Sequence, residues 1–225
     1  MTSKTGPLLV ARRAAAEALR RRLGFYADVT LPEFPADGWY SEDLHLRRYA
    51  EGDAAARLEL ENSRGMQLWD DDFVPMSTRA EFDAWLRSQD RRIREKRGPY
   101  ALAIESADGG PYLGDITLWR LRDRRETAEF GIALLPGARG RNTAGRAVRA
   151  TLNWIFASGT IRRVEIHHAV GNDAACFTAR RCGIPVEGTL HRAFSLRHED
   201  GSSEWLDVCA HGVCAEDLDL RRSGT

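Results

Sequence analysis

The sequence predicts an α+β fold built on one central mixed, mostly antiparallel, twisted sheet with flanking helices. Strand-like segments come as a run of three between residues 100 and 135, and the strands that follow alternate with helices without forming repeated βαβ units. The 225 residues show no internal repeat, and 43% of them are apolar, enough for one sizeable core. We therefore expect one domain at residues 41–214, after a helical extension and linker at 1–40 and before a flexible tail at 215–225.

The chain begins with an Ala- and Arg-rich segment that ends at Gly24. Its alanines and leucines recur on one helical face, which predicts an extra N-terminal helix packed on the domain. Six basic residues and one acidic residue lie between Lys4 and Leu23. This excess leaves a second interpretation open, in which the segment contacts RNA, the ribosome or another anionic partner.

The next segments predict a strand and two helices. Residues 43–49 alternate between polar and apolar side chains, as a half-buried strand does. Helices are expected at 51–63 and at 78–96, where Thr78 and Glu81 form a capping-box pattern. Between them, three carboxylates lie between Trp69 and Phe73; they form either a solvated loop or a site for a cationic amine. The candidate substrate-binding residues are Trp69, Asp71 and Asp72.

The rest of the chain supplies most of the sheet. An Asp108-Gly109-Gly110 turn predicts a hairpin between two of its strands. Apolar residues repeat every 3.6 positions over 143–157, which predicts an amphipathic helix. The expected elements are strands at 100–105, 112–121 and 128–135, a helix at 143–157, a strand at 162–170, a helix at 173–182, and a closing strand pair at 186–196 and 204–212.

Composition narrows the function classes. Thirty-three Lys and Arg balance thirty-three Asp and Glu, so the whole-chain charge does not favour nucleic acid or an anionic membrane. No apolar stretch reaches the roughly 20 residues of a membrane span, and we expect a cytoplasmic protein. The four cysteines form no CxxC pair and are expected to stay reduced, and no His or Cys spacing along the chain predicts a metal site.

The most informative segment runs from Phe130 to Gly145, where a strand turns through small and basic residues into the amphipathic helix. Backbone N–H groups at a helix N-terminus bind anions, and nearby arginines add positive charge, so this turn suits a pyrophosphate. It lacks the GK[ST] of a Walker A loop and the GxGxxG of a dinucleotide fingerprint. Taken alone, the segment favours an ordinary structural turn.

In context, this segment resembles the acyl-CoA signature of the GNAT superfamily of N-acetyltransferases. Glu129-Phe130-Gly131 matches the family strand, and residues 139–144 match the loop [R/Q]xxGx[G/A] except at Asn142, where the family has glycine. Residues 172–175 resemble the Asn-led helix, and residues 179–189 resemble the corresponding passage of RimJ/RimL-type enzymes. The resemblance covers nearly all of the chain from Leu44 to Val213.

The resemblance implies a GNAT fold in which the strands ending near Pro136 and beginning near Arg163 splay apart in a V. Acetyl-CoA or another acyl-CoA is then the acyl donor, and an amine on a protein N-terminus or a small molecule is the acceptor. Asn172 contacts the pantetheine arm, caps the following helix, or does both. The implied coenzyme-binding residues are Ile132, Ala133, Leu134, Arg139, Gly140, Arg141, Asn142, Thr143, Ala144 and Asn172.

For catalysis, the resemblance implies that a base removes a proton from the amine, which attacks the thioester directly. Glu129 is the first candidate base, with pairing to a cation such as Arg125 as the alternative interpretation, and His167 is the second. His167 and His168 must point to opposite faces of their strand, so only one faces the cleft.

Two departures leave open a catalytically impaired coenzyme-binding or regulatory module. Ala175 stands where RimL-type enzymes have serine, and Phe194 stands where some relatives carry a carboxylate. A homodimeric assembly is also left open.

Overall fold

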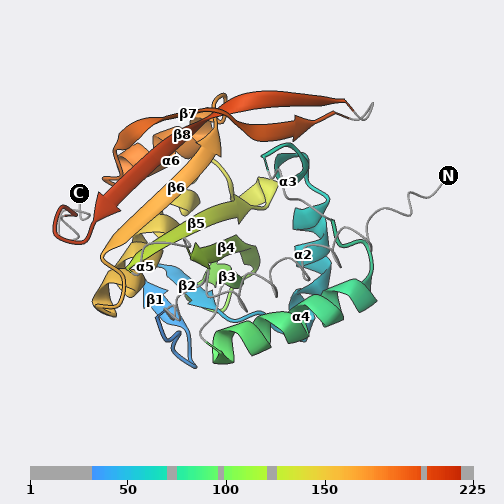
Figure 1. The fold of residues 1–225 in the computed structure, drawn as a ribbon. Helices are drawn as coiled ribbons and strands as arrows, with labels where there is room; N and C mark the ends of the chain where they lie inside the picture. Colours follow the sequence, from blue (N-terminus) through green and yellow to red (C-terminus); the bar gives the residue numbers. More distant parts are fainter. Residues whose placement is uncertain (1–31, 70–74, 96–98, 121–125, 199–201, 219–225) are drawn as a thin grey trace, which may run out of the picture.

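A computed structural model describes residues 32–69, 75–95, 99–120, 126–198 and 202–218. The predicted N-terminal helix, Asp71 and Asp72 lie outside these residues. An eight-stranded sheet in the order β1-β2-β3-β4-β5-β6-β8-β7 forms the centre of the molecule (Figure 1). Every neighbouring pair is antiparallel except β5 and β6, which are parallel. The predicted α+β class and mixed, mostly antiparallel sheet are confirmed.

Most predicted elements occur within two residues of their expected ends. The strands are β1 (Trp39–Ser41), β2 (Leu44–Arg47), β3 (Tyr100–Ser106), β4 (Tyr112–Arg120), β5 (Thr127–Leu134), β6 (Arg163–Ala169), β7 (Val186–Arg197) and β8 (Ser203–Cys214). The helices are η1 (Glu51–Asp53), α2 (Ala54–Glu61), α3 (Arg64–Trp69), α4 (Arg79–Arg94), η2 (Pro136–Ala138), α5 (Thr143–Ala157) and α6 (Asp173–Arg181).

Three details differ from the prediction. The strand β1 was not predicted, and it pairs with β2 around a turn where Glu42 takes a φ of 54°. The helix expected at 51–63 begins as the 3₁₀ turn η1 and ends at Glu61. A separate helix, α3, follows. By contrast, the capping box of α4 is confirmed, because Thr78 Oγ1 accepts from the Glu81 N–H while the Glu81 carboxylate accepts from the Thr78 N–H.

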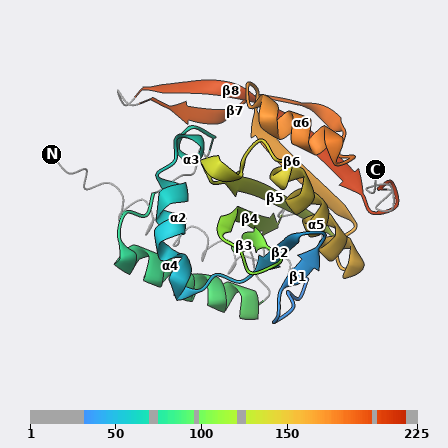
Figure 2. The same ribbon diagram turned by 180° about the vertical axis from the view of Figure 1, so that it is seen from behind.

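Helices cover both faces of the sheet (Figures 1 and 2). Alternating strand residues divide between the two layers: Leu102 and Ile104 join the main core with α5 and α6, whereas Ala101 and Ala103 pack with Phe82 of α4. Within the described residues, no helix is long and apolar enough to cross a bilayer.

Candidate active site

The two parallel strands at the centre of the sheet separate along their length. β5 pairs with β6 only at Thr127–Glu129, and beyond this point the strands diverge towards Leu134 and Ala169 (Figure 1). The predicted V-shaped splay is therefore present. Among the described residues, no strand pairs with β5 on the wedge side beyond Glu129, so another extended group can pair there.

The alternation of backbone groups shows which residues face this wedge. The Leu135 N–H donates to Leu113 O on β4, at 2.9 Å, so the backbone groups of Ala133 and Gly131 also point towards β4. Those of Ile132 and Leu134 then point into the wedge. Three strand residues were predicted to bind coenzyme. The backbone groups of Ile132 and Leu134 are thus oriented towards it, whereas those of Ala133 point towards β4.

The turn after β5 ends at an open helix N-terminus. Gly140 and Asn142 both take left-handed φ values, +76° and +58°. Asn142 is the N-cap of α5, yet its side chain makes no capping hydrogen bond. A Cβ on Gly145 would lie 2.5 Å from Asn142 Oδ1, so the amide of Asn142 lies over the first turn of α5. This helix end suits an anion, and the Asn142 side chain partly covers it.

The two arginines of the turn are exposed but differ in what they contact. Arg139 Nε donates to Leu134 O, at 3.0 Å, and its guanidinium lies beside Gly65 of α3. Arg139 therefore braces the end of β5, a role that the sequence did not predict. Arg141 is exposed at the turn. Thr143 is buried and Ala144 half-buried, so their part in holding an anion is through the backbone.

A second helix N-terminus lies at the far end of β6. Asn172 caps α6 by accepting from the Ala175 N–H at 3.3 Å, which confirms the capping role that the sequence left open. The cap uses the side-chain oxygen, so the amide nitrogen of Asn172 is not engaged by it. Ala175 occupies the first turn.

Glu129 and His167 form an acid–base pair where β5 and β6 begin to separate. His167 Nδ1 lies 3.2 Å from Glu129 Oε1, and His167 Nε2 lies 3.9 Å from Glu165 Oε2. The hydrogen bond to Glu129 is the main cause that raises the pKa of His167 above its ordinary value, with partial burial acting in the opposite direction. Arg163 binds Glu165 and Glu187, and its charge slightly opposes the rise.

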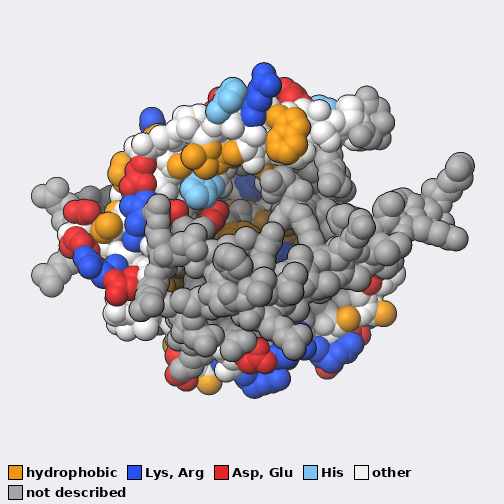
Figure 3. Space-filling view, viewed as in Figure 1, with side chains coloured by type: hydrophobic (Ala, Val, Ile, Leu, Met, Phe, Trp, Pro, Cys, Tyr) orange, Lys and Arg blue, Asp and Glu red, His pale blue; other side chains and the backbone are white. Residues whose placement is uncertain are grey.

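Trp119 lies next to this pair and was missed by the sequence reasoning. It pairs with Glu129 across β4 and β5, so the two side chains share a face of the sheet. A Cβ on Gly131 would lie 3.1 Å from the indole, which therefore covers that glycine. Trp119 is 38% exposed, whereas its neighbour Leu118 is fully buried. The face carries histidine and acidic side chains beside a hollow over β5 and β6 (Figure 3).

The predicted substrate-binding tryptophan lies near the same end of the wedge as Asn172. Trp69 is within 3.8 Å of the position of a Cβ on Gly171, directly before Asn172. It also packs on a cluster that contains Ala169 and Phe194. Phe194 is thus a core residue rather than a group facing the wedge.

These features lie where the sequence resemblance places the site of a coenzyme-dependent acetyltransferase, with Ala133 and Arg139 turned to other partners. The backbone groups of Ile132 and the N–H of Leu134 face the wedge, the N-terminus of α5 suits an anion, and the Glu129–His167 pair beside them suits acid–base chemistry. The residues therefore fit an acyl-CoA.

Comparisons with known proteins agree with this class. The sequence model of the acetyltransferase (GNAT) domain family matches residues 43–184. The chain belongs to this family of N-acetyltransferase enzymes. Spermidine N(1)-acetyltransferase of Vibrio cholerae serotype O1 is 24% identical over 163 residues, covering 71% of this chain and 90% of that protein.

Solved structures share the fold. Mycobacterium smegmatis RimJ in complex with CoA-disulfide superposes with a TM-score of 0.67 at 20% identity, covering 87% of this chain and 91% of that chain. RimL, a ribosomal L7/L12 alpha-N-protein acetyltransferase solved with coenzyme A, superposes with a TM-score of 0.66 at 20% identity. The match covers 82% of this chain and 98% of that chain. The resemblance to the GNAT family is confirmed, and the RimJ and RimL structures share its fold.

Proposed function

We propose that this chain transfers the acyl group of an acyl-CoA, most simply acetyl-CoA, to a primary amine by direct attack of the amine on the thioester. The observation that carries the proposal is the Glu129–His167 pair at the point where β5 and β6 separate. A base placed there stands beside the wedge that an extended thioester arm would enter. The family membership and the coenzyme A in the RimJ and RimL structures support the choice of donor.

In the proposed binding mode, the pantetheine arm lies along Ile132 and Leu134, and the pyrophosphate sits at the N-terminus of α5 with Gly140 and Arg141 beside it. Unpaired N–H groups at a helix end and exposed positive charge both favour a phosphate there. Asn172 is close enough to the end of β6 for its free amide nitrogen to meet the arm.

The proton path is proposed to begin at His167. Its Nδ1–H donates to Glu129, which leaves the Nε2 lone pair to take a proton from the incoming ammonium, directly or through one water. The neutral amine then attacks the thioester carbonyl, the tetrahedral intermediate collapses, and the coenzyme leaves as its thiol. Glu129 acts on the reaction through His167 as a positioning residue, in place of the direct base role predicted from the sequence.

For the acceptor, we propose a cationic amine. The indole face of Trp119 and the carboxylate of Glu129 lie side by side, and both attract a cation. The named activities of the relatives cover two such acceptors, the polyamine spermidine and a protein N-terminus. Trp69, Asp71 and Asp72 remain candidates for the outer part of this acceptor site.

The test is the pH dependence of coenzyme A thiol release from acetyl-CoA, over a panel of polyamines, amino acids and N-terminal peptides. With a responsive acceptor, kcat/KM rises as the pH increases through the raised pKa of His167, because the neutral imidazole is the base. His167→Gln lowers kcat about 100-fold or more and removes this rise of kcat/KM with pH. Glu129→Gln removes the main cause of the raised pKa of His167 and moves the midpoint of this rise to lower pH.

Two results would overturn the mechanism. One is a His167→Gln enzyme with an unchanged pH profile, and the other is an unchanged midpoint in Glu129→Gln. The alternative pairing of Glu129 with Arg125 involves a residue outside the described ones. Arg162→Ala, at an exposed pair with Glu216, is the matched control. It should leave both the rate and the midpoint unchanged.

A second candidate, a coenzyme-binding module without catalysis, is favoured by Ala175 at the first turn of α6 and by the Asn142 amide over the α5 N-terminus. Isothermal titration with acetyl-CoA separates the two. Binding without thiol release on every acceptor of the panel would favour the module, and no binding at high micromolar concentration would exclude both.

A further inference from the structure

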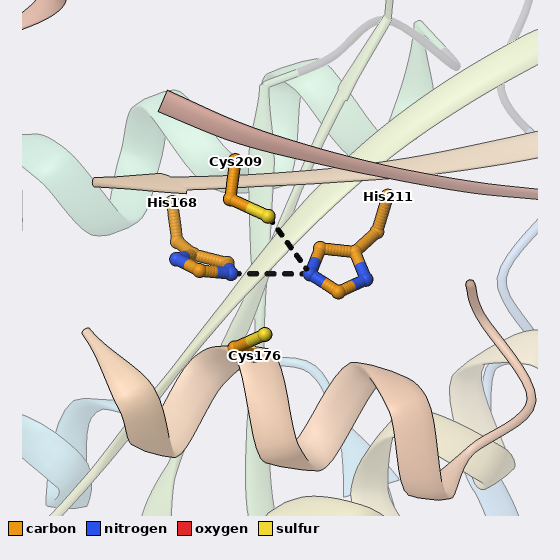
Figure 4. Close-up of side chains that lie close together, drawn as sticks. All are labelled: His168, Cys176, Cys209 and His211. Carbon is orange, nitrogen blue, oxygen red and sulfur yellow. Dashed lines mark hydrogen bonds between the residues drawn. The ribbon is translucent and has the colours of Figure 1, made fainter. Parts of the chain in front are cut away.

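Four side chains with metal-binding atoms converge on the face of the sheet opposite Glu129 and His167. His168 comes from β6, Cys209 and His211 come from β8, and Cys176 reaches them from α6 (Figure 4). Their ligand atoms all lie within 4.8 Å of one another. His211 is fully buried, and the other three are half-buried.

The hydrogen bonds of the two imidazoles leave both Nε2 atoms without a proton. His168 Nδ1 lies 2.9 Å from Ala169 O, and His211 Nδ1 lies 3.0 Å from Ile184 O. A carbonyl oxygen only accepts, so each Nδ1 carries the hydrogen of the neutral ring. The two Nε2 lone pairs then face each other at 3.2 Å.

Two acceptors at this separation repel unless a cation lies between them. The Cys209 thiol, whose Sγ is 3.5 Å from His211 Nε2, can donate to one of the lone pairs but leaves the other opposed. Anchoring of Nδ1–H on a backbone carbonyl is also how metal-ligating histidines are held in orientation. A proton on one ring would satisfy this pair alone, whereas a metal ion would also engage the two cysteine sulfurs, so the four converging ligand atoms point to a metal ion as the missing partner.

Two of the six separations between the four ligand atoms are hydrogen-bond distances within the cluster, and both match the edges of a tetrahedral zinc site. With Zn–N near 2.05 Å and Zn–S near 2.3 Å, tetrahedral angles place two nitrogens about 3.3 Å apart and a nitrogen and a sulfur about 3.6 Å apart. The observed distances are 3.2 Å between His168 Nε2 and His211 Nε2, and 3.5 Å between Cys209 Sγ and His211 Nε2. We propose that His168, Cys176, Cys209 and His211 bind one Zn²⁺ in a closed His₂Cys₂ site.

Such a site would be structural. Four protein ligands leave no open position for water, which is the arrangement of structural rather than catalytic zinc. The ion would join α6 to β6 and β8 through Cys176, and so hold the helix that begins at Asn172. This inference stands independently of the proposed acyl transfer, because it concerns the opposite face of β6.

Binding has a defined proton balance. Cys176 and Cys209 bind as thiolates and both histidines bind as neutral rings, so loading the site releases the two thiol protons and changes no oxidation state. The rival chemistry at this cluster is a disulfide between Cys176 and Cys209, which needs an oxidant and would remove both sulfur ligands.

The test uses the full untagged chain, purified without chelator. Elemental analysis is expected to find one zinc per chain. After removal of zinc, titration with Co²⁺ is expected to give the visible bands and the thiolate-to-metal charge-transfer band of a tetrahedral sulfur-containing site. At zinc concentrations 100–1,000 times the dissociation constant, the metal should raise Tm by roughly 5–15 °C.

Cys176→Ser is the main variant, because its half-buried position on α6 tolerates the change better than the buried His211. It should lower zinc affinity at least tenfold and weaken the charge-transfer band. Cys214→Ser, on β8 but outside the cluster, is the matched control and should keep both. Zinc bound equally by Cys176→Ser and the wild type, no cobalt spectrum, or a Cys176–Cys209 disulfide in the protein purified under reducing conditions would each overturn the proposal.

Discussion

Replacing Asn142 by glycine tests whether the N-terminus of α5 is the phosphate site. Asn142 holds a left-handed φ of 58° and lays its amide over the first turn of the helix without capping it. Glycine takes this φ without strain, and it removes the amide from the place where a phosphate would sit. We therefore expect Asn142→Gly to bind the coenzyme more tightly.

The size of the effect follows from what the amide covers. A hydrogen bond between a backbone N–H and a charged phosphate contributes about 1.5–3 kcal/mol, and 1.4 kcal/mol is a factor of ten in affinity. If the amide keeps one N–H group from the phosphate, its removal lowers the dissociation constant about tenfold. The expected range is three- to thirtyfold, because the Asn142 side chain is exposed and can partly move aside.

Isothermal titration of acetyl-CoA against the two proteins measures this change, with Asn142→Ala as the matched control. Alanine also removes the amide but is forced into the left-handed region, at a cost of about 1 kcal/mol, or a Tm lower by roughly 2–4 °C. Both variants should bind more tightly, and only alanine should lower Tm. An unchanged or larger dissociation constant in both would place the phosphates elsewhere and refute the reasoning.

Two further predictions concern the layer beside the site. Arg57 is 7% exposed and binds the buried carboxylates of Asp115 and Glu61, so Arg57→Ala removes the buried cation that balances their charge and should cost about 3–5 kcal/mol, or roughly 6–20 °C in Tm by thermal denaturation. The exposed pair of Arg79 with Asp83 is the control, and a comparable loss in Arg79→Ala would contradict this account. Gly131→Ala should raise KM for the amine by displacing the indole of Trp119, with a change in stability below about 1 kcal/mol. An unchanged KM would show that Trp119 is not part of the acceptor site.

The order of the elements could be predicted from the sequence because each has a local signal. The stripe of α5, the capping box of α4 and the turn at Asp108–Gly110 depend on residues within a few positions of one another. The V between β5 and β6 came with the family resemblance. By contrast, β1 is three residues long and is held by its pairing with β2, so it leaves no periodic pattern to detect.

Much of the candidate site depends on contacts between strands, and the register of those strands cannot be read from the sequence. Glu129 and His167 could each be named from the chain, but their 3.2 Å contact depends on the parallel register that sets Glu129 beside Glu165. Trp119 could have been found only from its register opposite Glu129 across the hairpin. Arg139, named as a phosphate ligand, folds back on Leu134 O because it lies at the turn directly after that strand ends.

The expectation that no metal is bound rested on spacing along the chain, and spacing carries little information when the ligands come from different elements. Cys209 and His211 lie two residues apart, as neighbours on one face of β8, and the antiparallel register places Cys209 opposite His168. The helical turn of α6 then brings Cys176 over them. Because consecutive residues of a strand face opposite sides, the adjacent residues His167 and His168 belong to different sites: the first is the proposed proton acceptor and the second a proposed zinc ligand.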